Sequence, residues 1–94
     1  MNEQLKLIDN KEAGRYEFHI EGYIPLIDYR ISDDGDIYLI HTEVPLALEG
    51  RGIGSQLVKE VLTDVKSRGL RLIPLCPFVA GYIKKHPEWR KIVS

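Results

Sequence analysis

The sequence predicts a mixed α/β fold, in which an antiparallel meander of strands leads into one parallel strand–helix–strand unit and a C-terminal helix. The first half of the chain alternates polar and apolar residues between turn-forming segments, as strands with one buried face do. The second half changes to the 3.6-residue spacing of an amphipathic helix, and a short apolar strand follows this helix. With 94 residues, the chain is expected to form a single domain over residues 1–94.

The expected meander begins with a short strand around residues 5–7, which a turn at 9–11 closes. Residues 15–20 then alternate strictly between polar and apolar side chains. This pattern predicts a second strand with one buried face, which ends at the Glu-Gly pair at 21–22.

A third strand is expected over residues 23–31, at an edge or a bulge because it contains Pro25. The turn-forming residues 32–36 separate it from a fourth strand. Residues 37–40 of this fourth strand are uniformly apolar, which predicts a central strand that is covered on both faces.

A loop at 45–50 leads into the amphipathic helix, which starts near Ile53 and ends before Gly69. The apolar positions of this helix fall on one stripe, formed by Ile53, Leu57, Val58, Val61, Leu62 and Val65. Residues 70–75 form the fifth strand, parallel to the fourth and reached by a right-handed crossover. Pro77 favours the first turn of a last helix that runs to residue 85.

Composition excludes several classes of protein. Hydrophobic residues make up 44% and charged residues 29%, as in ordinary globular proteins. No apolar run approaches the roughly 20 residues of a membrane span, and the first residues do not resemble a signal peptide. We therefore expect a soluble, cytoplasmic protein without membrane contact. With one cysteine and no metal-type spacing among the three histidines, neither a disulfide nor a bound metal is expected.

Charge is divided unevenly along the chain. Residues 1–47 carry ten acids against four bases, a balance of −6, and residues 48–94 carry four acids against nine bases, a balance of +5. This asymmetry is compatible with solvated surfaces, or with an anionic ligand held by the second half. Nucleic acid is not an expected partner, because no basic run alternates with aromatic residues.

The segment most suggestive of chemistry joins the fourth strand to the amphipathic helix. Gly50, Gly52 and Gly54 alternate with other residues here, so the backbone can approach a ligand closely, and the helix N-terminus presents free N–H groups to it. This arrangement suits a pyrophosphate. It is neither a P-loop, which needs Lys-Ser/Thr after its last glycine, nor a Rossmann loop, which would need glycine at Ser55. A glycine-rich loop without a ligand is the alternative.

Four segments, in this order, resemble the GNAT superfamily of acetyl-CoA-dependent N-acetyltransferases, and in particular its small, truncated members. They are His41–Pro45, the loop Glu49-x-x-Gly52-x-Gly54, Cys76-Pro77, and Tyr82-x-x-x-His86-Pro87-Glu88-Trp89. The resemblance covers roughly residues 15–90. Glu49 stands where the family has Gln or Arg, which weakens a role for this side chain in phosphate binding. The short chain also implies an open acceptor side.

The resemblance implies a mode of cofactor binding. The fourth and fifth strands would part, so that backbone groups at Thr42, Glu43 and Val44 contact the pantetheine arm of acetyl-CoA. The pyrophosphate would lie on the glycine-rich loop, at Arg51, Gly52, Ile53, Gly54 and Ser55.

Candidate catalytic residues follow from position and from the resemblance. Cys76 ends the fifth strand where a helix begins, which favours a thiolate that could accept the acetyl group; an inert buried cysteine is the alternative. Glu43 and His41 share one face of their strand, and either could deprotonate an amine; a solvated strand end and a core histidine are the alternatives. Tyr82 matches the family tyrosine that protonates the departing CoA thiolate, or is a core tyrosine. Trp89 and Phe78 are expected to be core residues.

These observations lead to one expected function and two alternatives. We expect an acetyl-CoA-binding, GNAT-like N-acetyltransferase that acts on an unidentified amine, with Cys76 as a possible covalent carrier. A non-catalytic acyl-CoA-binding or sensing module is the first alternative, and an interaction domain with an unused glycine-rich loop is the second. The acceptor and the oligomeric state stay open.

Overall fold

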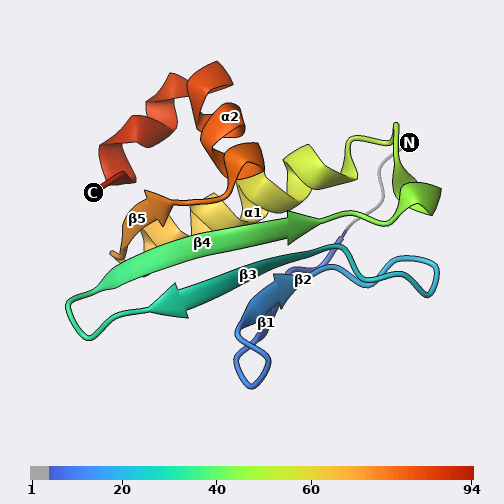
Figure 1. Ribbon diagram of the computed structural model, residues 1–94, viewed down its shortest axis with the longest axis horizontal. Helices are drawn as coiled ribbons and strands as arrows, with labels where there is room; N and C mark the ends of the chain where they lie inside the picture. Colours follow the sequence, from blue (N-terminus) through green and yellow to red (C-terminus); the bar gives the residue numbers. More distant parts are fainter. Residues whose placement is uncertain (1–4) are drawn as a thin grey trace.

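The computed structural model describes residues 5–94 and contains a five-stranded sheet with the strand order β1-β2-β3-β4-β5 (Figure 1). The first four strands pair antiparallel, and β4 pairs parallel with β5. This arrangement confirms the predicted meander and parallel unit. The strands are β1 (Ile8–Asn10), β2 (Arg15–Glu17), β3 (Leu26–Ile31), β4 (Asp36–Glu43) and β5 (Arg71–Pro74).

Two α-helices and two 3-10 helices accompany the sheet within the described residues. The α-helices are α1 (Ile53–Ser67) and α2 (Pro77–Lys85), and the 3-10 helices are η1 (Leu46–Leu48) and η2 (Pro87–Ile92). The predicted stripe of α1 is buried at all six of its positions, and Gly69 follows the helix with a positive φ of 68°. Pro77 is the first residue of α2, as expected.

One face of the sheet forms the core. Helix α1 lies behind β4 and β5 in Figure 1, and its apolar stripe packs against the inward-facing residues Ile37, Leu39 and Leu72. The α2 residues Val79 and Ile83 belong to the same cluster. Both helices therefore bury apolar surface against one face of the sheet.

The other face of the sheet is uncovered at β4, so the expectation of a strand buried on both faces is wrong. Ile37 and Leu39 are fully buried, but Tyr38 is only half-buried and Ile40 is 40% exposed. A run of four apolar residues predicts a strand covered on both faces, but the described helices cover only one side of β4. We call the uncovered side the outer face.

The first strand and its turn lie later in the chain than the sequence indicated. Strand β1 begins at Ile8, and the turn occupies residues 11–14. The Asn10 side chain accepts a hydrogen bond from the Ala13 amide at 3.2 Å, and Gly14 adopts a φ of 68°. These local bonds stabilise a turn at 11–14 in preference to one at 9–11.

The β2–β3 connection also differs from the prediction. Strand β2 pairs only up to Glu17, although the expected alternation of buried side chains continues to Ile20. Ile20 and Tyr23 form an isolated antiparallel bridge around a tight turn, in which Glu21 has a φ of 53°. Regular pairing in β3 starts at Leu26, after Pro25, which lacks an amide hydrogen.

The C-terminal segment adds an element that the sequence did not indicate. Helix α2 ends before the His86-Pro87 pair, as predicted, but η2 follows it directly. Val93 then forms a parallel bridge with Leu72, and the Ser94 amide donates to the Leu72 carbonyl at 2.8 Å. This segment therefore covers part of the free edge of β5.

Ion pairs between the two halves of the chain account for part of the charge asymmetry. Arg68 lies 3.3 Å from Asp9, and Arg71 lies 2.8 Å from Asp36. Each pair joins a base of the second half to an acid of the first. Arg68 and Arg71 therefore form ion pairs within the fold.

A buried carboxylate lies in β2. Glu17 is only 3% exposed, and its oxygens are bonded by Asn10 at 2.9 Å, Arg15 at 2.5 Å and His19 at 2.7 Å. Burial alone would raise the pKa of Glu17, but the hydrogen bonds from His19, Arg15 and Asn10 lower this pKa from 4.5 to about 2. The ionised form is therefore stabilised in the folded protein.

We expect this carboxylate to make the protein acid-sensitive. Because the pKa of Glu17 is lowered on folding, its contribution is present above about pH 4.5 and is lost as the pH falls toward 2. A shift of this size corresponds to about 3 kcal/mol of unfolding free energy. Because pH 3 is still above the folded-state pKa, urea unfolding at pH 6 and pH 3 measures part of this free energy, about 2 kcal/mol, and Glu17→Gln should flatten the difference. Glu12→Gln, which removes an exposed carboxylate nearby, is the control; an equal effect of both variants would contradict the assignment.

Candidate functional site

The glycine-rich loop and the first turn of α1 enclose a cavity of about 250 Å³. Gly52 is the N-cap residue of α1 and adopts a left-handed φ of 73°, and Gly50 has a φ of 81°. No atom lies within 4 Å of the position that a Cβ would take at either glycine. The cavity is lined by Val44, Leu48, Glu49, Gly50, Gly52, Ile53, Gly54, Ser55 and Phe78.

Gly54 lets helix α2 approach the loop. A Cβ at this position would lie 2.9 Å from Cζ of Phe78 and 3.4 Å from Cγ2 of Val44. The Phe78 side chain is 45% exposed and lines the cavity, so the expectation that it is a core residue is wrong. The first turn of α2 directs this ring toward the glycine-rich loop.

A second cavity, also of about 250 Å³, adjoins the first and shares Ser55 and Phe78 with it. It is lined by Ser55, Pro77, Phe78, Gly81, Tyr82, Lys85 and His86. The two cavities form a groove that runs from the glycine-rich loop along one side of α2. We call this groove the helix groove.

Tyr82 faces the helix groove and packs partly against the core. Its ring stacks on His86, with the two ring centroids 4.2 Å apart. Burial and the nearby Glu88 charge raise the pKa of Tyr82 above its usual 10.0. The phenol therefore keeps its proton at neutral pH.

Arg51 is the one predicted loop residue that does not line the groove. Its guanidinium forms two hydrogen bonds with Glu21, at 3.3 and 2.9 Å. Glu21 lies at the tip of the turn before β3, in the left-handed conformation noted above. The pair therefore joins the glycine-rich loop to this turn.

Strands β4 and β5 part at the level of the groove. Their parallel pairing ends at Leu39 and Pro74. The backbone amides of Leu75 and Cys76 both donate to the Leu39 carbonyl, each at 3.0 Å. Strand β4 continues to Glu43 by pairing with β3 alone. The edge of β4 beyond Leu39 is thus released from β5.

A β-bulge in β4 lies at the same level. Tyr29 is opposite Leu39, but the preceding residue of β3, Asp28, is opposite His41. Ile40 is therefore an extra residue without an opposite partner. It reverses the alternation of faces in the last part of β4.

The bulge decides which face each site residue takes. Directly paired residues point to the same face, so Thr42, opposite the fully buried Ile27, faces the helices. His41, opposite Asp28, faces the outer side. As predicted, Glu43 shares the face of His41, and its Oε1 lies 3.6 Å from Nε2 of the imidazole. His41 is exposed, which rules out a core histidine.

Thr42 and Cys76 meet where the strands part. The Cys76 thiol is buried and donates to the Thr42 hydroxyl at 3.2 Å. Cys76 is the N-cap residue of α2, as expected. Burial raises the pKa of Cys76, but the hydrogen bond with the Thr42 hydroxyl and those from the Val79 and Phe78 amides lower this pKa by more, so the net shift is downward.

The sequence-predicted residues therefore form three groups. The glycine-rich loop lines the helix groove with Tyr82, Thr42 and Cys76 meet between the parting strands, and His41 and Glu43 lie together on the outer face. Sequence reasoning missed Phe78, Lys85 and His86 as groove residues. Tyr82 and Lys85 follow Phe78 by four and seven residues, a spacing that places all three on one side of a helix. This spacing could have indicated Phe78 and Lys85 as groove residues once Tyr82 was assigned to the site.

Within residues 5–94, no helix is long and apolar enough to cross a bilayer. Nor do these residues contain a group of three or more His, Cys, Asp or Glu side chains that could hold a metal ion.

Comparison with known proteins gives matches in sequence. A family model described as GCN5-related N-acetyl-transferase matches residues 15–92. Protein NATD1 of Gallus gallus is 41% identical to this chain over 49 residues, which are 52% of this chain and 44% of that protein. Protein NATD1 of Homo sapiens has the same identity over 43% of its length. The match thus spans less than half of these relatives.

A solved structure matches the fold more completely. The solution NMR structure of a GCN5-like protein from Staphylococcus aureus has a TM-score of 0.71 to this chain. The match covers 97% of this chain and 87% of that one, with 22% sequence identity. At this identity the likeness concerns the fold.

Proposed function

Because this chain belongs to the GCN5-related N-acetyltransferase family, we propose that it binds acetyl-CoA and transfers the acetyl group to an amine. The observation that carries the proposal is the helix groove, which begins at the N-terminus of α1 and passes the point where β4 and β5 part. The family supplies the type of reaction, and this groove gives the donor a binding path. The cytoplasmic location expected from the sequence is part of the proposal.

The pyrophosphate of the donor binds the glycine-rich loop in this proposal. The left-handed Gly52 turns the chain into α1, so the first amides of a 15-residue helix point toward the cavity. Amides at a helix N-terminus attract anions through hydrogen bonds and the helix dipole. Ile53, Gly54 and Ser55 supply these amides, and Arg51 adds a positive charge beside them.

The pantetheine arm follows the released edge of β4. Beyond Leu39 this edge is free of β5, so backbone groups around Thr42, Glu43 and Val44 are available for the amides of the arm. The rest of the cofactor extends along α2, where Phe78 offers an apolar surface and Lys85 a positive charge. This path brings the thioester close to Cys76.

The direct route uses the outer-face pair. Glu43 or His41 takes a proton from the ammonium group of the acceptor. The amine nitrogen then attacks the thioester carbon, so that a C–N bond forms and the C–S bond breaks. The CoA sulfur leaves as a thiolate and takes the proton of the Tyr82 hydroxyl. The nitrogen releases its second proton to water as the amide forms, and the Tyr82 phenolate takes up a proton from water in turn.

The covalent route passes through Cys76. Its thiolate attacks the thioester carbon, a new C–S bond forms, and the old C–S bond breaks to release CoA. The amine then attacks the acetyl-cysteine, so that a C–N bond forms and the Cys76 thiolate is restored. The lowered pKa of Cys76 and the Thr42 hydroxyl at 3.2 Å support this route, because both favour the thiolate.

Calorimetric titration with acetyl-CoA, followed by measurement of free CoA in the presence of small amines, tests the proposed function. We expect saturable binding and acceptor-dependent release of CoA. Binding without release would support an acyl-CoA-binding module instead. Absence of binding would contradict the proposed function.

Removing the Glu21 charge is expected to strengthen cofactor binding several-fold. The Glu21 carboxylate holds Arg51 in two hydrogen bonds, so it competes with a phosphate for this cation and also repels it. Glu21→Gln keeps the shape of the turn. The dissociation constant for CoA at low and high salt measures the effect, which should shrink with salt. Asp33→Asn, an exposed acid removed from the β3–β4 turn, is the control; weaker binding by Glu21→Gln would contradict the competition.

A further inference from the structure

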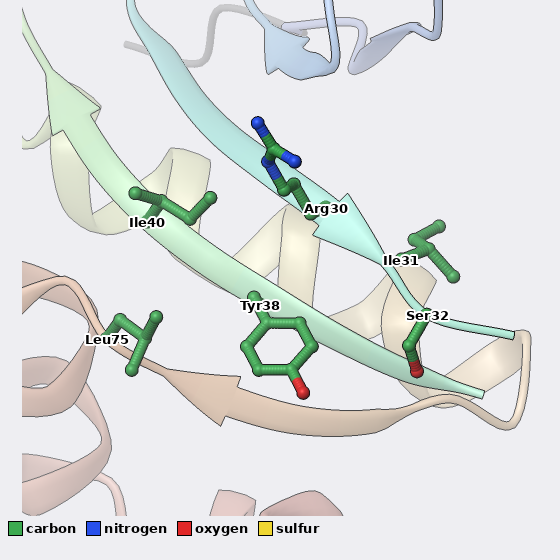
Figure 2. Close-up of a pocket in the computed structure, with 6 residues that line it drawn as sticks. All are labelled: Arg30, Ile31, Ser32, Tyr38, Ile40 and Leu75. Carbon is green, nitrogen blue, oxygen red and sulfur yellow. The ribbon is translucent and has the colours of Figure 1, made fainter. Parts of the chain in front are cut away.

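A third cavity, of about 330 Å³, lies on the outer face of the sheet, away from the helix groove (Figure 2). Ligand sites in proteins range from about 300 to 1,000 Å³, so this cavity suits a small molecule. It is lined by Arg30, Ile31, Ser32, Tyr38, Ile40 and Leu75.

The cavity is placed at the point where β4 and β5 part. Ile40 is the bulge residue that follows Leu39, and Leu75 follows Pro74, the last paired residue of β5. A molecule between Ile40 and Leu75 therefore lies next to the opening between the strands. The donor's thioester is proposed to reach the same opening from the helix side.

The lining combines an uncovered apolar surface with one cation. Ile31, Ile40 and Leu75 are 39%, 40% and 58% exposed, which is unusual for such side chains in a single concave site. Arg30 forms no ion pair within residues 5–94 and is opposite Tyr38 in the β3–β4 pairing, with its guanidinium directed away from the Tyr38 hydroxyl (Figure 2). A guanidinium of this kind suits a carboxylate.

Acidic groups lie on the far side of the bulge. Arg30 and Ile40 also line an adjoining hollow that includes Asp28. Asp28 is opposite His41 on the outer face, and Glu43 lies beside His41. Along the outer face, the chain thus presents a cation, an apolar surface and a group of acids.

We propose that the acceptor is a small amino carboxylate with an apolar side chain, and this proposal rests on the proposed function. The carboxylate binds Arg30, and the apolar side chain lies against Ile40 and Leu75. The ammonium group points toward the Asp28, His41 and Glu43 end, where it loses the proton that the transfer requires. Charge complementarity favours this class over a simple alkylamine, which offers no anion to the exposed Arg30 guanidinium.

Binding and turnover with two matched amines test the proposal. Phenylalanine and phenethylamine differ only in the carboxylate. Titration of each into the protein, with and without CoA, is followed by the NMR shifts of the Ile40 and Leu75 methyl groups. Release of CoA from acetyl-CoA is then compared between the two amines, for the unaltered protein and for Arg30→Gln. Lys59→Gln, which removes an exposed cation from α1, is the control.

Phenylalanine is expected to shift the Ile40 and Leu75 methyl signals and to exceed phenethylamine at least tenfold in kcat/KM. Arg30→Gln should remove this preference without changing the affinity for CoA. Equal use of both amines, no methyl shift, or acetylation of peptides alone would overturn the proposal. The methyl shifts can be measured without CoA. Failure of CoA binding would therefore contradict the proposed function, while the NMR titration would still test whether this cavity binds the amino carboxylate.

Discussion

Replacing Cys76 with alanine is expected to abolish a covalent acetyl label that acetyl-CoA leaves on the protein. The thiol is buried beside the Thr42 hydroxyl at the first turn of α2, where amide groups favour the thiolate. Exchange between two thioesters is nearly isoenergetic, so positioning is the main requirement for transfer. Without the thiol, this carrier is lost, and turnover through it should fall to background.

Mass spectrometry after incubation with acetyl-CoA and no amine measures the label, which hydroxylamine should remove. A denatured sample gives the background rate for a free thiol. Affinity for CoA in Cys76→Ala should stay within about tenfold, or ~1.4 kcal/mol, which shows that the site is intact. Thr42→Val should slow labelling without abolishing it. Full turnover by Cys76→Ala would contradict the covalent route and make Glu43 the residue to test.

Replacing Gly52 with valine is expected to weaken CoA binding at least tenfold, or by about 1.4 kcal/mol. Gly52 has a φ of 73°, lines the cavity, and has open space around the position that a Cβ would take. A β-branched side chain would strain the left-handed conformation by roughly 1–2 kcal/mol and would fill space proposed for the phosphates. Both effects act on the loop at the start of α1.

Gly35→Val separates strain from occlusion. Gly35 lies in the β3–β4 turn with a φ of 87° and equally open surroundings, but it does not line the helix groove. Both variants should lose similar unfolding free energy, as urea denaturation measures. Only Gly52→Val should lose affinity in calorimetry. Equal affinities for the two variants would exclude the loop from the cofactor site.

Most of the fold could be predicted because its elements have strong local signals. The stripe of six apolar residues in α1 has the period of a helix, and all six are buried. Gly69 and Pro77 mark boundaries through their backbone conformations, and the structure places both where expected. The parallel pairing of β4 and β5 then follows from the strand–helix–strand order.

The errors concern properties that depend on distant parts of the chain. An apolar run such as 37–40 does not reveal how many layers cover it, so the outer face was not predicted. The bulge at Ile40 depends on how β4 pairs with β3. The residues around Ile40 contain no local sequence pattern that marks the extra residue. The first turn moved to 11–14 because Asn10 and Gly14 stabilise it together.

The sequence indicated many residues of the candidate site, but few of the contacts between them. Alternation alone placed His41 and Glu43 on one face, which the structure confirms. The contact between Thr42 and Cys76 joins two strands and could not be predicted from either. The Arg51–Glu21 pair depends on the turn before β3, whose distance from the loop is set by the whole sheet.

The bulge at Ile40 makes the arrangement of the site depend on the register of one strand. A slip that paired Ile40 with Asp28 in place of His41 would restore strict alternation from Leu39, and would turn His41 toward the helices and Thr42 toward the outer face. The sheet would keep its hydrogen-bonding pattern after this slip, while the thiol lost its hydroxyl partner. Deletion of Ile40, in contrast, would remove the bulge and leave both side chains on their present faces. A shift of one residue in the pairing of β4 would therefore separate foldability from activity in this chain.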